Sequence, residues 1–255
     1  MTVIPTTHDH YYILRNLVEK DFKVRYRNMS LGIFWSLVNP LIMMGVLTFV
    51  FTVIFPSQRP NFWLFVLMGI LPYNFFTMAW ATGTNSIVDN ASLIKKVPFQ
   101  RELIPVSVVI GNLVHYLIQL GLLLLAAAFV TGVNLQWIWL PVVVLLQVVF
   151  VCGVSFLSSS LDVYYRDVRY VVESANLVLF WLVPIFYGFE DISPSYAWIY
   201  ELNPVAAVVL VTRRILLHGV SPGLTIWKLA AVSVMTLALG AFVFNRIKKD
   251  FSDYL

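Results

Sequence analysis

Charged residues are scarce in this sequence, and so is cysteine. Only 12% of the 255 residues are Asp, Glu, Lys or Arg, whereas 60% are hydrophobic. A water-soluble domain cannot cover its surface with so few charges, so the composition excludes one and indicates an integral membrane protein. The single cysteine, Cys152, excludes an internal disulfide and a cysteine-rich metal site.

Several signatures of catalysis and nucleotide binding are also missing. The sequence contains no G-x-x-x-x-G-K-[ST] phosphate loop, no H-E-x-x-H zinc pair and no G-x-S-x-G nucleophile turn. We therefore expect no catalytic residue, no metal site and no cofactor on this chain. A membrane enzyme acting on glycans remains an alternative, but it has no visible catalytic group.

Long apolar runs dominate what is present. An α-helix needs about 20 apolar residues to cross the ~30 Å hydrocarbon core of a bilayer. Six runs reach about that length, over residues 31–55, 62–81, 105–130, 137–159, 171–189 and 226–245. A seventh run, 205–217, is too short to span and carries two arginines, so we expect it to be re-entrant or interfacial. The expected fold class is an all-α integral membrane protein with six transmembrane helices, forming a single transmembrane domain over residues 1–255.

The basic residues predict the orientation of these spans. With the N-terminus inside, all but four of the 17 Lys and Arg residues fall in cytoplasmic segments, where basic residues are retained. The four outer ones are Arg59, Arg213, Arg214 and Lys228. Both termini are therefore predicted to be cytoplasmic. In so apolar a chain, the net charge of +4 is expected to face membrane lipids and not nucleic acid.

The segment before the first run has the pattern of an amphipathic helix. Apolar residues recur from Leu14 to Ile33 in steps of three or four, while most charged residues fall on the other side. A basic amphipathic helix lies in the headgroup plane, so we predict an interface helix over residues 10–30. It could be only a topology anchor, or a collar at a cytoplasmic entrance that meets an anionic head such as a phosphate. The candidate entrance residues are Arg25, Tyr26 and Arg27.

The loop after the second run, NASLIKKVPFQRELIPV, predicts a short helix from Ser92 to Lys96. Pro98 disfavours helix at the residue before it and so ends this helix. We expect Phe99 to be exposed between charges, where an aromatic side chain suits docking to a partner protein. An ordinary topology loop is the alternative. The candidate docking residues are Ser92, Leu93, Lys95, Lys96, Phe99 and Arg101.

A third charged segment, LDVYYRDVRYVVE, joins the fourth and fifth runs. On a continuous helix Asp162 and Arg166 would face each other at i, i+4. Such a pair could simply neutralise its charges at the membrane boundary, or it could belong to a cytoplasmic gate or a second partner contact. The candidate gate-side residues are Asp162, Arg166 and Asp167.

Aromatic residues make up 15% of the chain, and several lie within the predicted spans. Tyr73, Phe76, Phe180 and Trp181 are examples. Their flat apolar faces suit stacking on sugar rings, although packing inside the protein is the alternative for each of them.

Six segments occur in a specific order: KVRYRNMSLGIFWSLVNPL, NASLIKKVPFQRELIPV, DVYYRDVRYVVE, FWLVPIFYGFEDISPSY, YELNPVAAVV and the tail IKKDFSDYL. Together they resemble the transmembrane subunit of polysaccharide ABC exporters, which are type-2 ABC exporters. Within that group the sequence is most similar to the Wzm-type O-antigen permeases and the related teichoic-acid permeases. The resemblance covers essentially the whole chain.

The resemblance implies a homodimer around a channel, with a separate cytoplasmic ATP-binding cassette subunit that holds ATP and Mg. Residues 92–101 would be the coupling helix that enters this subunit, and residues 190–217 would form short gate helices on the outer side. The implied cargo is a polysaccharide on undecaprenyl pyrophosphate, moved across the bacterial cytoplasmic membrane. The channel-lining aromatics would be Phe34, Trp35, Tyr73, Phe76, Phe180 and Trp181.

Two other transporter classes remain as alternatives. A type-2 ABC exporter for drugs or lipids would share the six spans and the coupling loop, and only its cargo would differ. A secondary transporter is disfavoured, because the sequence shows no inverted repeat and no acidic residue at a predicted midplane.

Overall fold

The computed structural model describes residues 7–25, 34–55, 57, 59–96, 99–196, 200 and 203–255. In that part of the chain the regular structure is helical, without strands, as the expected all-α class requires. The longer helices are α1 (Thr7–Arg25), α2 (Trp35–Phe49), α3 (Phe62–Asp89), α5 (Leu103–Val130), α6 (Leu140–Tyr164), α7 (Val168–Leu182), α9 (Pro204–Leu216) and α10 (Leu224–Ile247). The short elements are η2 (Val50–Ile54), α4 (Ala91–Lys96), η3 (Leu135–Trp139), η4 (Phe189–Asp191), η5 (Pro194–Tyr196), η6 (Lys248–Asp250) and α11 (Phe251–Tyr254).

Five helical segments of the described residues are long and apolar enough to cross a membrane. They are Trp35–Ile54, Phe62–Asp89, Leu103–Val130, Leu135–Tyr164 and Leu224–Asp250. The run 171–189, expected to be a sixth span, instead ends its helix at Leu182. α7 has 15 residues and is therefore about 22 Å long, which is shorter than the hydrocarbon core.

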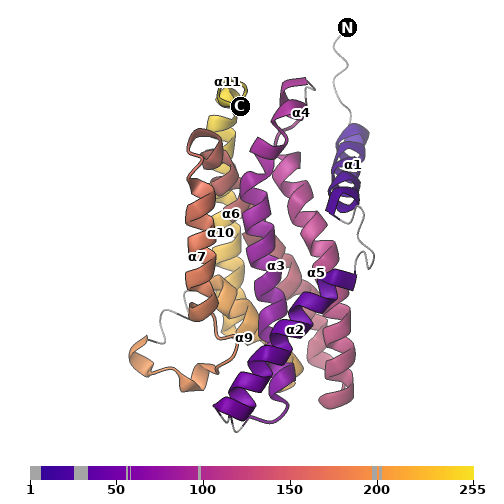
Figure 1. The fold of residues 1–255 in the computed structure, drawn as a ribbon, viewed down its shortest axis with the longest axis vertical. Coiled ribbons are helices and arrows are strands. Elements are labelled where there is room, and N and C mark those ends of the chain that lie inside the picture. Colours follow the sequence, from indigo (N-terminus) through magenta and orange to yellow (C-terminus); the bar gives the residue numbers. More distant parts are fainter. Residues whose placement is uncertain are drawn as a thin grey trace.

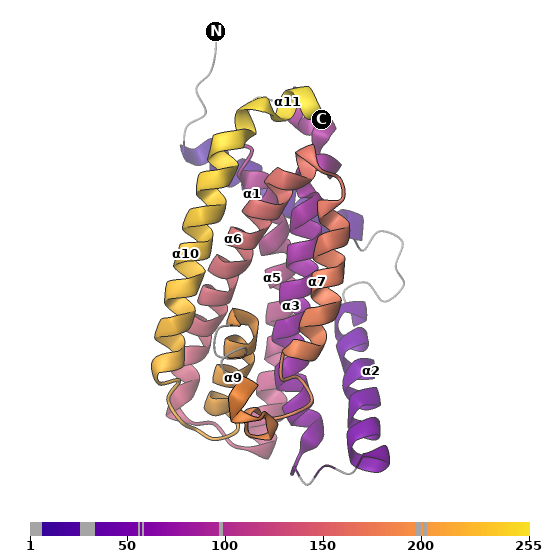
Figure 2. The same cartoon turned by 90° about the vertical axis from the view of Figure 1, so that its left-hand side faces the viewer.

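Helix α3 forms the centre of the bundle and contacts α2, α5, α6, α7 and α9 (Figures 1 and 2). Residues 62–72 of α3 are apolar on every side of the helix, which is typical of a helix buried on all sides. Leu64, Met68 and Leu71 are accordingly almost completely buried. The remaining helices pack around this apolar axis and position the polar features described below.

Helices α6 and α10 make the most extensive contact in the bundle, and glycine explains how closely they approach. A Cβ atom built on Gly153 of α6 would lie 2.6 Å from the backbone nitrogen of Leu237 on α10. A Cβ on Gly240 of α10 would overlap the backbone of Gly153. Small residues at helix contacts in membranes allow this backbone-to-backbone approach.

The chain between α7 and α10 is irregular and partly buried. Pro184 follows the last residues of α7, and the buried segment 183–185 leaves the helical pattern, because the backbone NH of Ile185 donates to the carbonyl of Val183, only two residues before it. Helix α9, which contains the seventh apolar run, has 13 residues and is about 20 Å long. It packs against α3, α6, α10 and η3, towards one end of the bundle (Figure 1).

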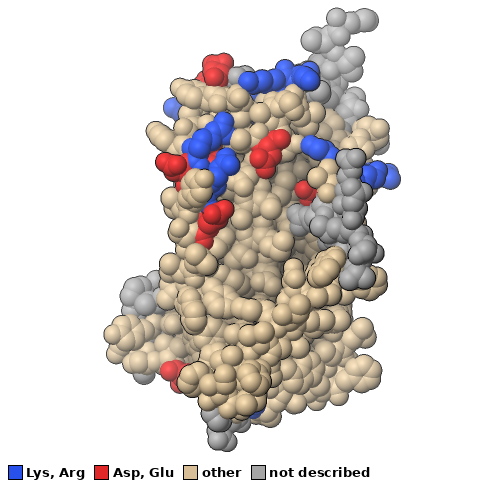
Figure 3. Space-filling view, in the orientation of Figure 1, with Lys and Arg blue, Asp and Glu red and all other residues tan. Residues whose placement is uncertain are grey.

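The charged side chains gather at the other end of the bundle. In the face shown in Figure 3, most Lys and Arg side chains lie near the end that carries α4 and α11 in Figure 1. We call this the charged end, and the end near α9 and η2 the opposite end. The middle of the molecule shows few charges in this view, which suits a surface that contacts hydrocarbon.

Candidate functional site

The charged end carries the short helix predicted after the second apolar run. It is present as α4, with Ser92, Lys95 and Lys96 exposed and Leu93 half-buried. Ile94 is the buried residue that holds the helix against the bundle. The two lysines therefore project from a short helix that is anchored on one side only.

Phe99 does not lie fully exposed between charges, as the sequence suggested. It is half-buried and packs against a cluster at the charged end, which includes Ile87, Ile104 and Phe244. The expectation was wrong because residues distant in sequence supply an apolar surface beside the loop. Phe99 therefore also contributes to the packing of the charged end.

The C-terminal segment, residues 248–255, covers the loop that follows α4. Arg101 donates to the backbone carbonyl of Lys248, and its guanidinium lies 5.9 Å from the centre of the Phe251 ring. The ammonium of Lys248 forms an ion pair with Glu102. Arg101 and Glu102 are thus held to the end of the chain by two charged contacts.

The same C-terminal segment also contacts the end of α6. Tyr164 donates from its hydroxyl to the carbonyl of Ile247 at 3.0 Å, and its ring centre lies 4.5 Å from that of Tyr254. Sequence reasoning missed these contacts, although the aromatic residues of FSDYL were a signal. The loop after α4 and the C-terminal end of α6 are therefore linked through residues 248–255.

Asp162 of the third charged segment has a different partner from the one expected. Helix α6 ends at Tyr164, so Asp162 and Arg166 do not share a helix and the i, i+4 pair is wrong. Asp162 is fully buried and accepts a hydrogen bond from Nη2 of Arg169 on α7 at 3.1 Å. Arg166 and Asp167 are exposed. The buried ion pair therefore connects the last turn of α6 with the first turn of α7.

Helix α1 lies against α5 near the charged end. Its Phe22 ring stacks on His115 of α5 with ring centres 5.1 Å apart, and Lys20 donates to the side chain of Asn90 at 2.8 Å. On its exposed face, the Arg15 guanidinium beside Glu19 lowers the pKa of that carboxyl. Helix α1 is thereby joined to α5 and to the junction of α3 and α4.

The predicted entrance residues follow directly after these contacts. The side chain of Arg25, and all of Tyr26 and Arg27, lie outside the described residues.

The six candidate channel aromatics differ in how far they are buried. Tyr73 and Phe76 of α3 are buried, and the Tyr73 hydroxyl donates to the carbonyl of Asn176 on α7. Trp181 of α7 and Phe34 before α2 are exposed to 66% and 62%. The two remaining residues are Trp35, exposed on α2, and Phe180, half-buried on α7. Three of the six rings thus lie on the surface of the single chain, on or directly before α2 and α7.

Comparison with protein families decides the classification. The model of the ABC-2 type transporter family matches residues 13–217, which is most of the chain. The chain belongs to the ABC-2 type transporter family. This ABC-2 type transporter chain is 31% identical over 242 residues to the O-antigen export system permease protein RfbA of Klebsiella pneumoniae, covering 94% of this chain and 93% of the relative.

Other relatives of this ABC-2 type transporter chain have related names. RfbA of Myxococcus xanthus, also an O-antigen export system permease protein, is 30% identical over 245 residues, covering 94% of each chain. The polysialic acid transport protein KpsM of Escherichia coli is 22% identical over 236 residues, covering 89% of this chain and 90% of the relative.

Proposed function

We propose that this chain is the permease subunit of an ATP-driven exporter that moves polysaccharide linked to undecaprenyl pyrophosphate, of the O-antigen type, across the bacterial cytoplasmic membrane. The observation that carries the proposal is the 31% identity to an O-antigen export permease over nearly the full length of both chains. Two chains form the channel, and a separate ATP-binding cassette subunit supplies ATP hydrolysis with its Mg ion.

The ATPase subunit docks at the charged end, on the exposed side of α4. Lys95 and Lys96 offer two cations to an acidic cleft, while Ile94 keeps the helix seated. Movement of α4 would reach the end of α6 through Arg101 and the C-terminal segment, because these parts are in contact. The Asp162–Arg169 ion pair would transmit this movement from α6 to α7.

The charged end is cytoplasmic in this proposal, with both termini on that side. The distribution of Lys and Arg supports this, since basic residues are retained on the inner side of the membrane. Helix α7 and the extended segment after it together complete the sixth crossing. Extended backbone is tolerated at membrane depth when its carbonyl groups are bonded inside the protein, and those of Pro184 and Ile185 are bonded by Arg213.

The channel forms between two copies, with α2 and α7 facing the cargo. Both helices expose large apolar side chains, among them the rings of Trp35 and Trp181. Many weak contacts with such rings suit a polymer that has to slide, because one tight site would stop it. At the entrance, Arg25 and Arg27 meet the pyrophosphate, since guanidinium groups bind phosphate in a bidentate manner.

The test is to purify the chain with the ATPase encoded by the neighbouring gene and to measure ATP hydrolysis with defined lipid-linked glycans. An O-antigen-type glycan on undecaprenyl pyrophosphate should stimulate hydrolysis more than an acidic capsular glycan, a teichoic acid or a drug. Failure of every glycan lipid to stimulate hydrolysis would favour a drug or lipid exporter.

A paired variant tests the docking surface. The double change Lys95→Glu and Lys96→Glu should abolish co-purification of the ATPase, because it reverses two exposed charges. Lys249→Glu, an exposed lysine of η6 at the same end, is the matched control and should keep the complex. Equal recovery of the ATPase with both variants would reject α4 as the docking element.

A further inference from the structure

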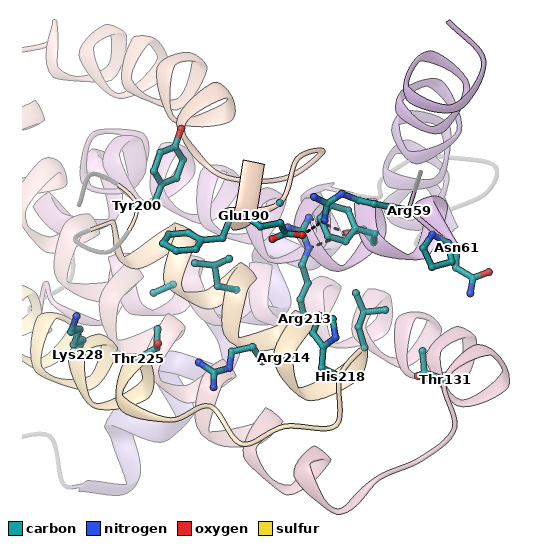
Figure 4. Close-up of a pocket in the computed structure, with 17 residues that line it drawn as sticks. Arg59, Asn61, Thr131, Glu190, Tyr200, Arg213, Arg214, His218, Thr225 and Lys228 are labelled. Carbon is teal, nitrogen blue, oxygen red and sulfur yellow. Dashed lines mark hydrogen bonds and ion pairs between the residues drawn. The ribbon is translucent and has the colours of Figure 1, made fainter. Parts of the chain in front are cut away.

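The four basic residues that the sequence assigns to the outer side all line one pocket. Arg59, Arg213, Arg214 and Lys228 come from the loop before α3, from α9 and from α10 (Figure 4). The pocket lies at the opposite end and has a volume of about 620 Å³, within the usual range of ligand sites. Among the lining residues that the structure describes, Glu190 is the one carboxylate.

Glu190 and its neighbour already have a partner. Arg59 binds Glu190 at 2.6 Å and Asp191 at 2.7 Å, through different guanidinium nitrogens. A backbone hydrogen bond and this arginine together lower the pKa of Glu190, so the carboxyl is ionised at neutral pH. Both acidic residues therefore form their ion pairs with Arg59 and not with the α9 arginines. Four cationic and two anionic side chains still leave an excess of positive charge around the pocket.

Arg213 contributes a second, buried charge to the pocket wall. Only 4% of this residue is exposed, and its guanidinium donates to the carbonyls of Phe65, Pro184 and Ile185 at distances of 2.5 to 3.3 Å. Carbonyl oxygens satisfy its hydrogen bonds but do not cancel its charge. Within the described residues no carboxylate forms an ion pair with it, so it adds a positive potential to the pocket.

Arg214 lies beside the N-terminus of α10, which adds its own positive potential to the pocket. A Cβ atom built on Gly223 would lie 3.4 Å from Nη2 of Arg214, and Gly223 is the N-cap of α10. The N-terminus of a 24-residue helix carries a partial positive charge, and α10 has no acidic residue in its first turn. Arg214 has no ion pair with any carboxylate of the described residues. A cation next to a positive helix end is unfavourable, and a bound anion would relieve it.

The remaining lining residues show what kind of anion fits. Thr225 in the first turn of α10 and His218 after α9 also line the pocket, with a hydroxyl and an imidazole that lie on either side of Arg214 in the view of Figure 4. Phe65, Leu210 and Leu217 make much of the rest of the wall apolar. A site with cationic donors beside an apolar wall matches an anionic head attached to an apolar chain.

We propose that this pocket binds the phosphate group of a lipid headgroup, with Arg214 and the N-terminus of α10 as its direct partners. Guanidinium groups and helix N-termini are both common phosphate binders. Two kinds of lipid carry this group, an anionic phospholipid of the surrounding membrane and a prenyl pyrophosphate carrier. The site lies at the far end from the α4 docking surface and does not depend on which glycan is exported.

Native mass spectrometry of the purified full chain in detergent tests the proposal. The probes are phosphatidylglycerol, farnesyl pyrophosphate, zwitterionic phosphatidylcholine and inorganic phosphate. We expect Arg214→Gln to weaken the binding of phosphatidylglycerol, of farnesyl pyrophosphate or of both by about tenfold or more, because a charge-assisted hydrogen bond is lost. The matched control is Arg246→Gln, an exposed arginine in the last turn of the same helix at the charged end, which should bind like the wild type.

Comparing the two anionic lipid probes identifies the source of the phosphate. A larger loss for phosphatidylglycerol assigns the pocket to membrane phospholipid, and a larger loss for farnesyl pyrophosphate assigns it to a carrier. The proposal is overturned if Arg214→Gln and Arg246→Gln bind the two anionic lipids equally well. It is also overturned if Arg214→Gln weakens only the binding of inorganic phosphate or of phosphatidylcholine. If Arg214→Gln lowers the melting temperature, Arg214→Lys serves as a second variant, because it keeps the positive charge and should retain lipid binding. Loss of lipid binding by a folded Arg214→Lys chain would likewise overturn the phosphate assignment.

Discussion

Replacing the buried Arg213 with methionine should strongly destabilise the protein. The guanidinium donates to carbonyls of Phe65 on α3 and of Pro184, Ile185 and Tyr187 in the irregular segment after α7. Helical bonding cannot satisfy the carbonyls of that irregular segment, because Pro184 ends the regular pattern. Methionine has similar length and no donor, so several buried acceptors would lose their partner.

The expected loss follows from these contacts. A hydrogen bond to a charged group contributes about 1.5–3 kcal/mol, and an unsatisfied buried acceptor costs about 1–3 kcal/mol. Burial of the guanidinium is itself unfavourable and offsets part of this sum. We therefore expect the free energy of unfolding to fall by about 3–5 kcal/mol, which is also the range for breaking a buried charged interaction.

The assay is SDS-induced unfolding in mixed micelles, followed by circular dichroism. Arg214→Met is the matched neighbour, because its guanidinium has no hydrogen bond to a carbonyl of the described residues, and it should change the unfolding free energy by less than about 1 kcal/mol. Arg213→Lys should fall between the two, since one ammonium cannot reach all of these carbonyls. A loss below about 1 kcal/mol for Arg213→Met would refute the argument that this side chain holds the irregular segment.

Two further predictions concern helix contacts. Gly240→Ala should cost about 1–3 kcal/mol in the same assay, because its Cβ overlaps the backbone of α6, whereas Gly121→Ala on α5 meets nothing within 4 Å and should be neutral. Arg169→Met should cost about 3 kcal/mol by leaving buried Asp162 unpaired, while Arg166→Met at an exposed site should be tolerated. Equal effects within either pair would contradict the corresponding contact.

The sequence was sufficient to predict the long helices. The helices around the predicted spans 62–81, 105–130, 137–159 and 226–245 are present as α3, α5, α6 and α10, because the length and apolarity needed to cross a bilayer can be read directly from a run of residues. The short helix from Ser92 to Lys96 was also predictable, since Pro98 marks its end.

Pairings between distant segments were not predictable. The i, i+4 pair of Asp162 and Arg166 failed because the helix ends between them, and nothing in the local sequence indicated Arg169 instead. The predicted span 171–189 likewise combined a helix with an extended segment, whose carbonyls are bonded by Arg213 from another element. Periodicity describes one helix at a time and does not reveal which remote side chain completes a site.

The glycine contact between α6 and α10 limits how the bundle can change shape. Because Gly153 and Gly240 place two backbones in direct contact, these helices cannot rotate or slide against each other without steric overlap. The two helices therefore move together as one rigid body. An opening wide enough for a polymer therefore has to come from the other side of α3, where α2 and α7 are held more loosely. A disulfide across α6 and α10 should leave transport intact, whereas one joining α2 to α3 should stop it.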